Sequence, residues 1–410
     1  MKKITTAILI LVFGNAFAHA QFGGGSPYSA FGIGQLKSGV FGQTEAMAGS
    51  GIGLRSPAFL NLTNPAAFTS IDLPFNMMLD AGFNMQFYHL ATNTEATNQQ
   101  NGSFSHLVTW FRPHRKWATS VGLVPYSQVA YSVTTTRYLA GTDEQYLLNY
   151  DGEGGVNRLF WGNAVQLTPS WSIGGNINFL FGSLDEKEYF ISNTAIGSFD
   201  VISNTHLRGL NVDLGTQWTI PVYNNRLTLG MTMTPGTSLF SKRTATLTSQ
   251  SGELEEVLNP SEDYALPLKV GGGFAFAASQ WTLTGDVTFE EWSAINLGSD
   301  VETVDTWTGS IGLEYAPFRN QRQDYFKTLL LRGGFRYRNS YLKINGNTFP
   351  DWLATLGVGI PIGRSGNHVN LNYAYNRNGT TDNGLILESK HQLSLSFSLR
   401  DVWFLKRKFN

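Results

Sequence analysis

The sequence predicts an all-β fold, a transmembrane antiparallel β-barrel of about fourteen strands with an N-terminal plug in its lumen. Three observations predict this class. The chain opens with an export signal, it is poor in charged residues but rich in aromatic ones, and most of it alternates apolar and polar residues with a period of two. A wall with one face toward lipid and one toward a polar lumen accounts for all three.

The first twenty residues have the order of a secretory signal peptide. Met1–Lys3 is a short positive head, 8–13 is an apolar run, and Ala18-His19-Ala20 is a small-x-small cleavage site. The apolar run is far shorter than the roughly 20 residues of a helical span. We therefore expect cleavage near Ala20 and a mature chain in the cell outer membrane that begins at Gln21.

Composition excludes several classes of protein. Charged residues make up 14% of the chain and aromatic residues 13%, whereas soluble domains carry about 25% charged residues. The formal net charge of −1 gives no electrostatic basis for binding nucleic acid. Because the chain contains no Cys, neither a disulfide, a thiolate metal site nor a lipid anchor is expected.

Alternating segments run through the chain from residue 75 onward. In 369–376 and 392–399 large apolar side chains occupy every second position, so each strand has one apolar and one polar face. Fourteen such segments have about the 9–11 residues that a tilted strand needs to cross a membrane. They lie at 75–89, 103–112, 116–126, 156–168, 171–184, 206–219, 225–240, 266–277, 280–292, 307–316, 327–338, 354–363, 367–376 and 390–399.

The connections between these segments alternate in length. Outer-membrane barrels have short periplasmic turns and long external loops, whereas a soluble β-sandwich, the alternative all-β fold, has no reason to sort its connections. A Trp beside each of four short turns predicts a ring at the periplasmic interface, although Trp is also simply common in strands. The short connections are 113–115, 168–170, 221–225, 278–279 and 363–366, the Trp residues are 117, 171, 218 and 281, and the long polar loops are 90–102, 127–155, 185–205, 241–265, 293–306, 339–353 and 377–389.

Residues 21–74 lack sustained alternation and are rich in Gly, Ser, Ala and Pro. Their low charge and many small apolar residues argue against a solvated tail. The predicted organisation is therefore a signal peptide (1–20), a plug (21–74), a barrel (75–400) and a basic periplasmic C-terminal tail (401–410).

The plug carries a resemblance to a known family. Ala46–Gly53, followed by Leu60–Phe68 with Asn64-Pro65, resembles the N-terminal hatch of the long-chain fatty-acid transporter (FadL-type, toluene-transporter-like) superfamily, and Ser120–Tyr126 resembles its third strand. Ser26–Gly34 is similar to an uncharacterised branch. The resemblance implies a fourteen-strand barrel with a buried N-terminus. The type IX secretion shuttle barrel is a relative with the same architecture and a protein-handling role.

Three places in the chain are candidates for gating. Gly49, Gly51 and Gly53 superficially suggest a phosphate loop, but they follow no strand, so tight plug packing is the better interpretation. Asn64-Pro65 should set how the chain leaves the lumen, because Pro fixes φ and Asn bonds neighbouring backbone. Pro125 either kinks the third strand and opens the wall laterally, as the resemblance implies, or merely ends the strand near the rim.

Charged residues within the alternating segments should face the lumen, because a charge on the lipid face costs about 2–4 kcal/mol near the midplane. They are predicted either to dock the plug through ion pairs, which we favour, or to guide a polar ligand group. These residues are Asp80, Asp213, Lys269, Asp286, Glu314, Arg332, Arg336 and Arg338.

No catalytic set, metal-spaced cluster or cofactor motif is recognisable, so an enzyme is not expected. The preferred hypothesis is passive transport of small hydrophobic molecules across the outer membrane. The alternative is a structural barrel that binds protein partners in a secretion, assembly or surface complex. Expected partners are outer-membrane lipid, and either a hydrophobic small molecule or outer-membrane proteins. An apolar lumen would favour transport, and a lumen filled with paired charges would favour the partner role.

Overall fold

The computed structural model describes residues 24–138, 145–191, 199–249, 252–256, 263–295, 301–317, 328–344, 346–363 and 366–403. The predicted signal peptide and Lys406–Lys408 of the tail lie outside these ranges. Within the described ranges no helix is both long and apolar enough to cross a membrane.

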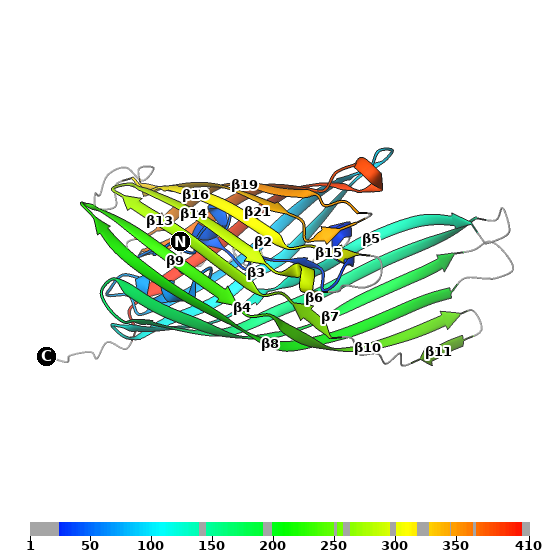
Figure 1. Cartoon of the computed structure of the whole chain (residues 1–410), viewed down its shortest axis with the longest axis horizontal. Helices are drawn as coiled ribbons and strands as arrows, with labels where there is room; N and C mark the ends of the chain where they lie inside the picture. The colour runs from blue at the N-terminus through cyan, green and yellow to red at the C-terminus, as the bar shows by residue number, and fades with distance from the viewer. Residues whose placement is uncertain are drawn as a thin grey trace, which may run out of the picture.

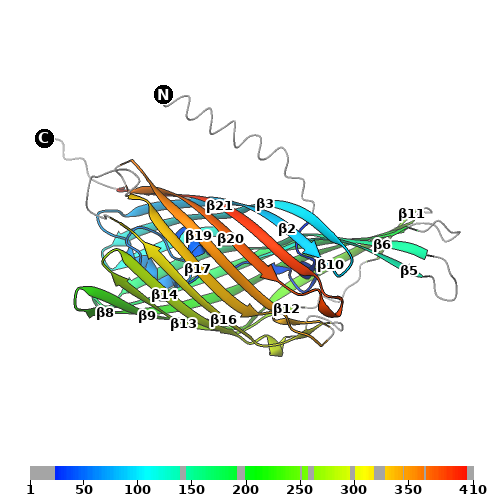
Figure 2. The ribbon, with the colours of Figure 1, turned by 90° about the horizontal axis from the view of Figure 1, so that it is seen from above.

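The wall is a closed antiparallel barrel of fourteen strands. The last strand, β21 (Leu387–Asp401), pairs along its whole length with the first, β2 (Met77–Ala91), and this pairing closes the sheet (Figure 2). The other strands between them are β3 (Ala96–His114), β4 (Trp117–Pro125), β5 (Ser127–Tyr138), β6 (Gln145–Gln166), β7 (Trp171–Ile191), β8 (Phe199–Val222), β9 (Asn225–Thr234), β10 (Thr237–Ser249), β11 (Gly252–Glu256), β12 (Tyr264–Leu266), β13 (Lys269–Ala278), β14 (Trp281–Glu290), β16 (Thr306–Tyr315), β17 (Leu330–Asn339), β19 (Pro350–Ile362) and β20 (Asn367–Asn378).

Three wall positions are each filled by two strands that are separated at a proline. β4 gives way to β5 after Pro125, β9 to β10 at Pro235, and β12 to β13 at Pro267. Proline has no N–H to donate to a ladder, so it favours such breaks. The prediction of a single strand over 225–240 was therefore wrong, since β9 pairs with one part of β8 and β10 with another.

The outer surface is the apolar one. Along β7, Ile173, Ile177 and Phe179 are exposed, whereas Asn176 and Asn178 between them are buried on the inner side. The four predicted Trp residues beside short turns are also exposed, and Trp171 pairs directly with Trp218 across β7 and β8. An apolar exterior around a polar interior is the arrangement of a barrel in lipid.

Four of the predicted long loops are largely strand, and those loop predictions were wrong. One is 90–102, where β2 continues to Ala91 and β3 begins at Ala96. The regions predicted as loops at 127–155, 185–205 and 241–265 contain β5, β11, β12 and the outer parts of β6, β7, β8 and β10. These strands form a sheet that projects well beyond the rest of the barrel (Figure 1). Polar residues such as Asp185 and Lys187 interrupt the apolar alternation in this region, while the backbone ladder continues. The other long connections hold short elements: η3 (Trp292–Ala294), β15 (Glu302–Thr303), β18 (Leu342–Lys343) and η5 (Asp382–Gly384).

The segment before β2 is folded inside the barrel as a plug (Figure 1). It begins at the end with the long connections, where Tyr28 stacks on Phe349 at 4.6 Å, and it descends to Ile71 near the start of β2. Most of its apolar side chains are buried against the wall. Its elements are η1 (Pro27–Ala30), β1 (Gln35–Leu36), α2 (Gly42–Ala46) and η2 (Pro65–Ser70).

Candidate functional site

The part of the plug that leads into β2 is anchored to the wall through Asn64-Pro65. Asn64 Oδ1 accepts from the N–H of Ala66 at 3.1 Å and caps η2, while Nδ2 donates to the carbonyls of Ile52 at 2.9 Å and Thr216 at 3.1 Å. A Cβ added to Gly215 of β8 would lie 2.1 Å from Asn64 Oδ1. The wall is thus shaped to receive this turn, at the position where the sequence predicts a gating element.

The predicted glycines Gly51 and Gly53 meet a neighbouring part of the wall, on β13 and β14. The carboxylate of Asp286 accepts from the N–H groups of Gly51 at 2.6 Å and Ile52 at 2.9 Å. A Cβ on Gly53 would lie 2.5 Å from the backbone of Phe274. Gly49 adopts φ +85°, a left-handed conformation that favours glycine. Gly53 therefore allows backbone to pack closely against backbone, whereas Gly49 permits a left-handed turn.

A buried ion pair supports the middle of the plug. Arg332 Nε lies 2.8 Å from Glu314 on the neighbouring strand, and Gln43 of α2 donates to the same carboxylate at 2.7 Å. The guanidinium of Arg332 also lies 4.4 Å from the ring centroid of Phe59. Asp286, Glu314 and Arg332 thus contact the plug directly, as a docking network requires.

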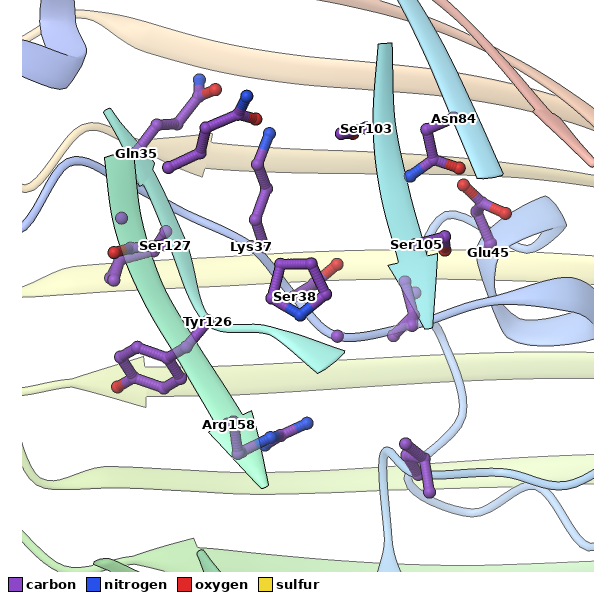
Figure 3. A pocket seen from close by; sticks show the side chains of 18 of the residues that line it. Gln35, Lys37, Ser38, Glu45, Asn84, Ser103, Ser105, Tyr126, Ser127 and Arg158 are labelled. Carbon is purple, nitrogen blue, oxygen red and sulfur yellow. The ribbon is translucent and has the colours of Figure 1, made fainter. Parts of the chain in front are cut away.

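Above the plug lies a cavity of about 2050 Å³. Five of the predicted lumen residues line it (Figure 3 shows its part near the plug), and all of them except Asp286 belong to oppositely charged clusters. The clusters are Arg336 and Arg338 with Asp351, Lys269 with Glu290 at 2.9 Å, and Arg158 with Asp213 at 3.6 Å. Among the predicted charged residues, Glu314 and Arg332 contact the plug, Asp286 contacts the plug and also lines the cavity, and the residues of the oppositely charged clusters line the cavity.

Another part of the cavity lining is apolar. Leu36 and Tyr126 line it together with Leu207 and Leu266, and they pack on a buried cluster that contains Ile33 of the plug. The lumen is therefore neither wholly apolar nor wholly filled by charges, so it meets neither of the two sequence-based criteria in full.

Lys37 of the plug extends into this cavity (Figure 3). The pKa of Lys37 is lowered to about 7, first by burial and then by the nearby ammonium of Lys390, while Glu388 acts in the opposite direction. The predicted plug includes Lys37, but no local pattern singles out this residue as one that lines the cavity.

A gap in the wall opens beside the cavity. β3 pairs with β4 up to Leu107 and Leu123, but beyond that point β5 pairs with β6 and with β1 of the plug instead of with β3. The break coincides with Pro125, the last residue of β4, which pairs with Asn157. Residues 100–105 of β3 and 126–128 on the other side both line the cavity. Pro125 therefore ends a strand and also marks the start of a lateral gap.

The N-terminal end of the plug fills this gap. Gln35 lies opposite Gln128 and Leu36 opposite Ser127 in β5, and the Lys37 N–H donates to the carbonyl of Tyr126 at 2.9 Å. The hydroxyl of Ser29 bonds both backbone groups of Ala130, at 3.0 and 3.1 Å. The edge of β5 is thus partly completed by a segment that is not part of the wall.

Asp80 belongs to a buried cluster that the sequence did not reveal. His106 Nε2 lies 2.8 Å from Asp80 Oδ1, and the hydroxyl of Ser398 donates to Oδ2 at 2.5 Å. His106 is one of seven dispersed His residues. Only the pairing of β2 with β3 brings it to Asp80, so no local pattern identifies it. No group of three or more potential metal ligands occurs among the described residues.

The fold and the lumen define the class of this protein as a transmembrane β-barrel with a fourteen-strand wall closed around an N-terminal plug. The chain belongs to the BamG family, whose model matches residues 1–410. No curated protein matches it.

Several solved structures share this fold. The toluene transporter TbuX of Ralstonia pickettii is 16% identical, with 88% of this chain and 98% of that chain covered and a TM-score of 0.59. The monoaromatic hydrocarbon channel CymD is 15% identical, with 92% and 99% covered and a TM-score of 0.58. A FadL homologue of Pseudomonas aeruginosa is 12% identical, with 90% and 99% covered and a TM-score of 0.56. At these identities the likeness concerns the fold.

Proposed function

We propose that this chain is an outer-membrane barrel that passes small hydrophobic molecules between its lumen and the membrane through the gap between β3 and β5. The observation that carries the proposal is that a large cavity reaches a break in the wall at Pro125. A molecule that leaves sideways enters lipid directly and never crosses the water on the far side.

The surroundings of the gap support such a route. The inner surface beside β5 carries Leu36, Tyr126 and the apolar cluster around Ile33. Two of the three charged clusters lie farther round the lumen on β13 to β19, whereas the pair Arg158–Asp213 lies on β6 and β8. Structures with the same fold include proteins described as a toluene transporter and a monoaromatic hydrocarbon channel. The export signal and the apolar exterior support an outer-membrane location.

A disulfide that fixes β1 to β5 tests the route. Leu36→Cys with Ser127→Cys replaces directly opposed residues, and the hydrogen bond from Lys37 to Tyr126 makes this the closer, non-hydrogen-bonded type of pair that suits a disulfide. The native chain has no Cys to interfere. Oxidation should lower uptake of a monoaromatic probe by cells, and a reductant should restore it.

The matched control places the same disulfide away from the gap. Thr303→Cys with Leu342→Cys joins β15 to β18, where the hydrogen bond from Val304 to Tyr341 gives the same type of pair. Oxidation of this control should leave uptake unchanged. Equal uptake by the oxidised gap variant and the wild type would show that hydrophobic molecules do not pass through the gap.

A second candidate function is that of a structural barrel that binds protein partners. The projecting outer sheet favours it, because β6, β7 and β8 have 22, 21 and 24 residues, about twice the 9–11 that a membrane crossing requires. A transport barrel alone has no need of this extension.

A register-matched truncation separates the two functions. Lys187 pairs with Ile202, so deletion of 187–202 shortens the β7–β8 hairpin without shifting its ladder. If the sheet holds a partner, the truncated barrel should migrate alone on native gels of gently solubilised membranes, while the full chain migrates in a larger complex. Identical migration of the two would reject this function for the sheet.

A further inference from the structure

A chain of three side chains lies in the lumen at the edge of the cavity. The hydroxyl of Ser105 is 2.9 Å from His106 Nδ1, and the other ring nitrogen, Nε2, is 2.8 Å from Asp80 Oδ1. His106 and Asp80 are both almost fully buried, with side chains 1% and 2% exposed. Ser105 lines the cavity. A hydroxyl, an imidazole and a buried carboxylate in this order are the parts of a serine hydrolase.

The local backbone makes this arrangement possible. In the β2–β3 ladder Gly82 pairs with His106 and Phe83 with Phe104, so Ser105 is an extra residue in a β-bulge. Neighbouring strand residues normally point to opposite faces, but a bulge redirects a side chain and is over-represented next to active sites. The bulge therefore allows two consecutive residues to serve one site.

Neighbouring residues hold the imidazole of His106 in place. The ring of Phe41 stacks on it with centroids 3.8 Å apart and an angle of 13° between the planes. A Cβ on Gly82 would lie 2.6 Å from His106 Cε1, so glycine at this position leaves room for the ring. Ser398 donates to the second oxygen of Asp80 and fixes the carboxylate. These contacts limit the movement of His106, and a general base is effective only when it is held in the correct orientation to the hydroxyl, here that of Ser105.

The hydrogen bonds define one useful tautomer. A carboxylate accepts, so the proton of neutral His106 lies on Nε2, and Nδ1 is left to accept from the hydroxyl of Ser105. Asp80 thereby orients the ring and stabilises the imidazolium that forms when Nδ1 takes a proton. Asp80 is thus a positioning residue, and Ser105 and His106 are the groups that would meet substrate.

A donor for a developing oxyanion lies nearby. Asn84 pairs directly with Ser103, and both line the cavity beside Ser105 (Figure 3). The carboxamide oxygen of Asn84 is buried and has no hydrogen-bond partner among the described residues. This oxygen therefore does not tie the carboxamide to a neighbour in the wall. Its amide group can donate to an oxygen held above Ser105.

We propose that Ser105 and His106, positioned by Asp80, hydrolyse carboxylic acyl esters that reach the lumen cavity. Ser105 Oγ attacks the ester carbonyl carbon while its proton passes to His106 Nδ1. The C–O bond to the alcohol then breaks, and the alcohol leaves with that proton. Water attacks the acyl-serine in the same way, so one ester and one water give one acid and one alcohol. This activity does not depend on the proposed transport through the gap.

A serine-reactive fluorophosphonate tests the nucleophile in the purified full chain in detergent. The probe should label the wild type, and mass spectrometry should locate it on Ser105. Ser105→Ala should abolish labelling, whereas Ser103→Ala, two residues away on the same strand and in the same cavity, should keep it. Heat-modifiable migration on gels checks that each variant is a folded barrel. No labelling of the folded wild type above a heat-denatured sample, or equal labelling of S105A, overturns the proposal.

Hydrolysis of p-nitrophenyl butyrate tests the two supporting residues. His106→Gln should lower the rate by roughly 10²–10⁴-fold, the usual contribution of a general base. Asp80→Asn should lower kcat with little change in KM, because the carboxamide no longer fixes the tautomer of His106 that accepts from Ser105. A folded D80N barrel with an unchanged kcat would show that Asp80 does not position His106, and unchanged hydrolysis by folded H106Q would rule out the proposed mechanism.

Discussion

At the scale of single residues, the plug and the wall are fitted to each other through glycines and amides more than through ion pairs. Asn64 makes hydrogen bonds to its own turn and to β8, and Gly215 provides the space for it. A buried amide group that loses its hydrogen-bond partner lowers the stability of the folded state by about 1–3 kcal/mol. The plug should therefore respond strongly to small changes on the wall.

Gly215→Ala should loosen the plug while the barrel stays closed. The new Cβ would lie 2.1 Å from Asn64 Oδ1, and overpacking of this kind costs about 1–3 kcal/mol. Limited trypsin digestion should then cut at Arg55, and heat-modifiable migration should remain. Gly309→Ala is the matched control, because a Cβ at Gly309 of β16 meets nothing within 4 Å. Equal protection of both variants would show that the plug does not depend on this contact.

Lys37→Met should stabilise the folded chain in a pH-dependent way. The pKa of Lys37 is lowered to about 7 in the folded state from the ordinary 10.5, so protonated Lys37 opposes folding. This opposition is complete below about pH 7 and fades as the pH rises toward the ordinary value. The gain in urea midpoint for K37M should therefore be larger at pH 6 than at pH 10. A gain independent of pH would mean that packing, not charge, is responsible.

At the scale of elements, strands end where pairing ends, not where apolar alternation ends. β6, β7 and β8 continue through segments that the sequence marks as polar loops, because each has a neighbour to complete its ladder. The opposite happens at Pro125, where β3 and β5 separate and the plug strand β1 replaces the missing neighbour.

The last strand should be indispensable and the tail beyond it dispensable. β21 pairs with β2 on one side and β20 on the other, so deletion of 390–410 leaves two unpaired edges in lipid and should abolish insertion. Deletion of 405–410 should be tolerated, because Trp403, which bonds Asn76, is retained. Outer-membrane fractionation of both variants measures this. Equal loss of both from the membrane would place the tail within the fold.

At the scale of the whole molecule, the two ends of the barrel differ. One end has short turns and the exposed Trp residues, and the other has the projecting sheet and the start of the plug (Figure 1). We expect the projecting sheet to lie outside the cell, because outer-membrane barrels have their short turns toward the periplasm.

Cysteine labelling of intact cells should report this orientation. Cys at Asn98 or Thr246, on the side of the long connections, should react with a membrane-impermeant maleimide, whereas Cys at His114 or Ser279, in short turns, should not. The native chain has no Cys, so the background is clean. Labelling at His114 or Ser279 in intact cells would reverse the orientation.

The sequence by itself determined the fold class, the fourteen-strand wall, the N-terminal plug and the inward direction of the charged residues. These follow from local information, since a period of two assigns each side chain to a face and lipid excludes charge from one of them. The same reasoning placed Asp286, Glu314 and Arg332 toward the plug side of the wall without knowledge of their partners.

The tertiary structure alone decided how far strands continue, where the wall opens and which residues share a site. His106 meets Asp80 through the pairing of two strands, and Ser105 joins them through a one-residue bulge in that ladder. Lys37 reaches the cavity because β1 fills the gap beside β5. Register, bulges and gaps depend on partners distant in sequence, and a period-two pattern carries no information about which neighbour a strand will pair with or where that pairing stops.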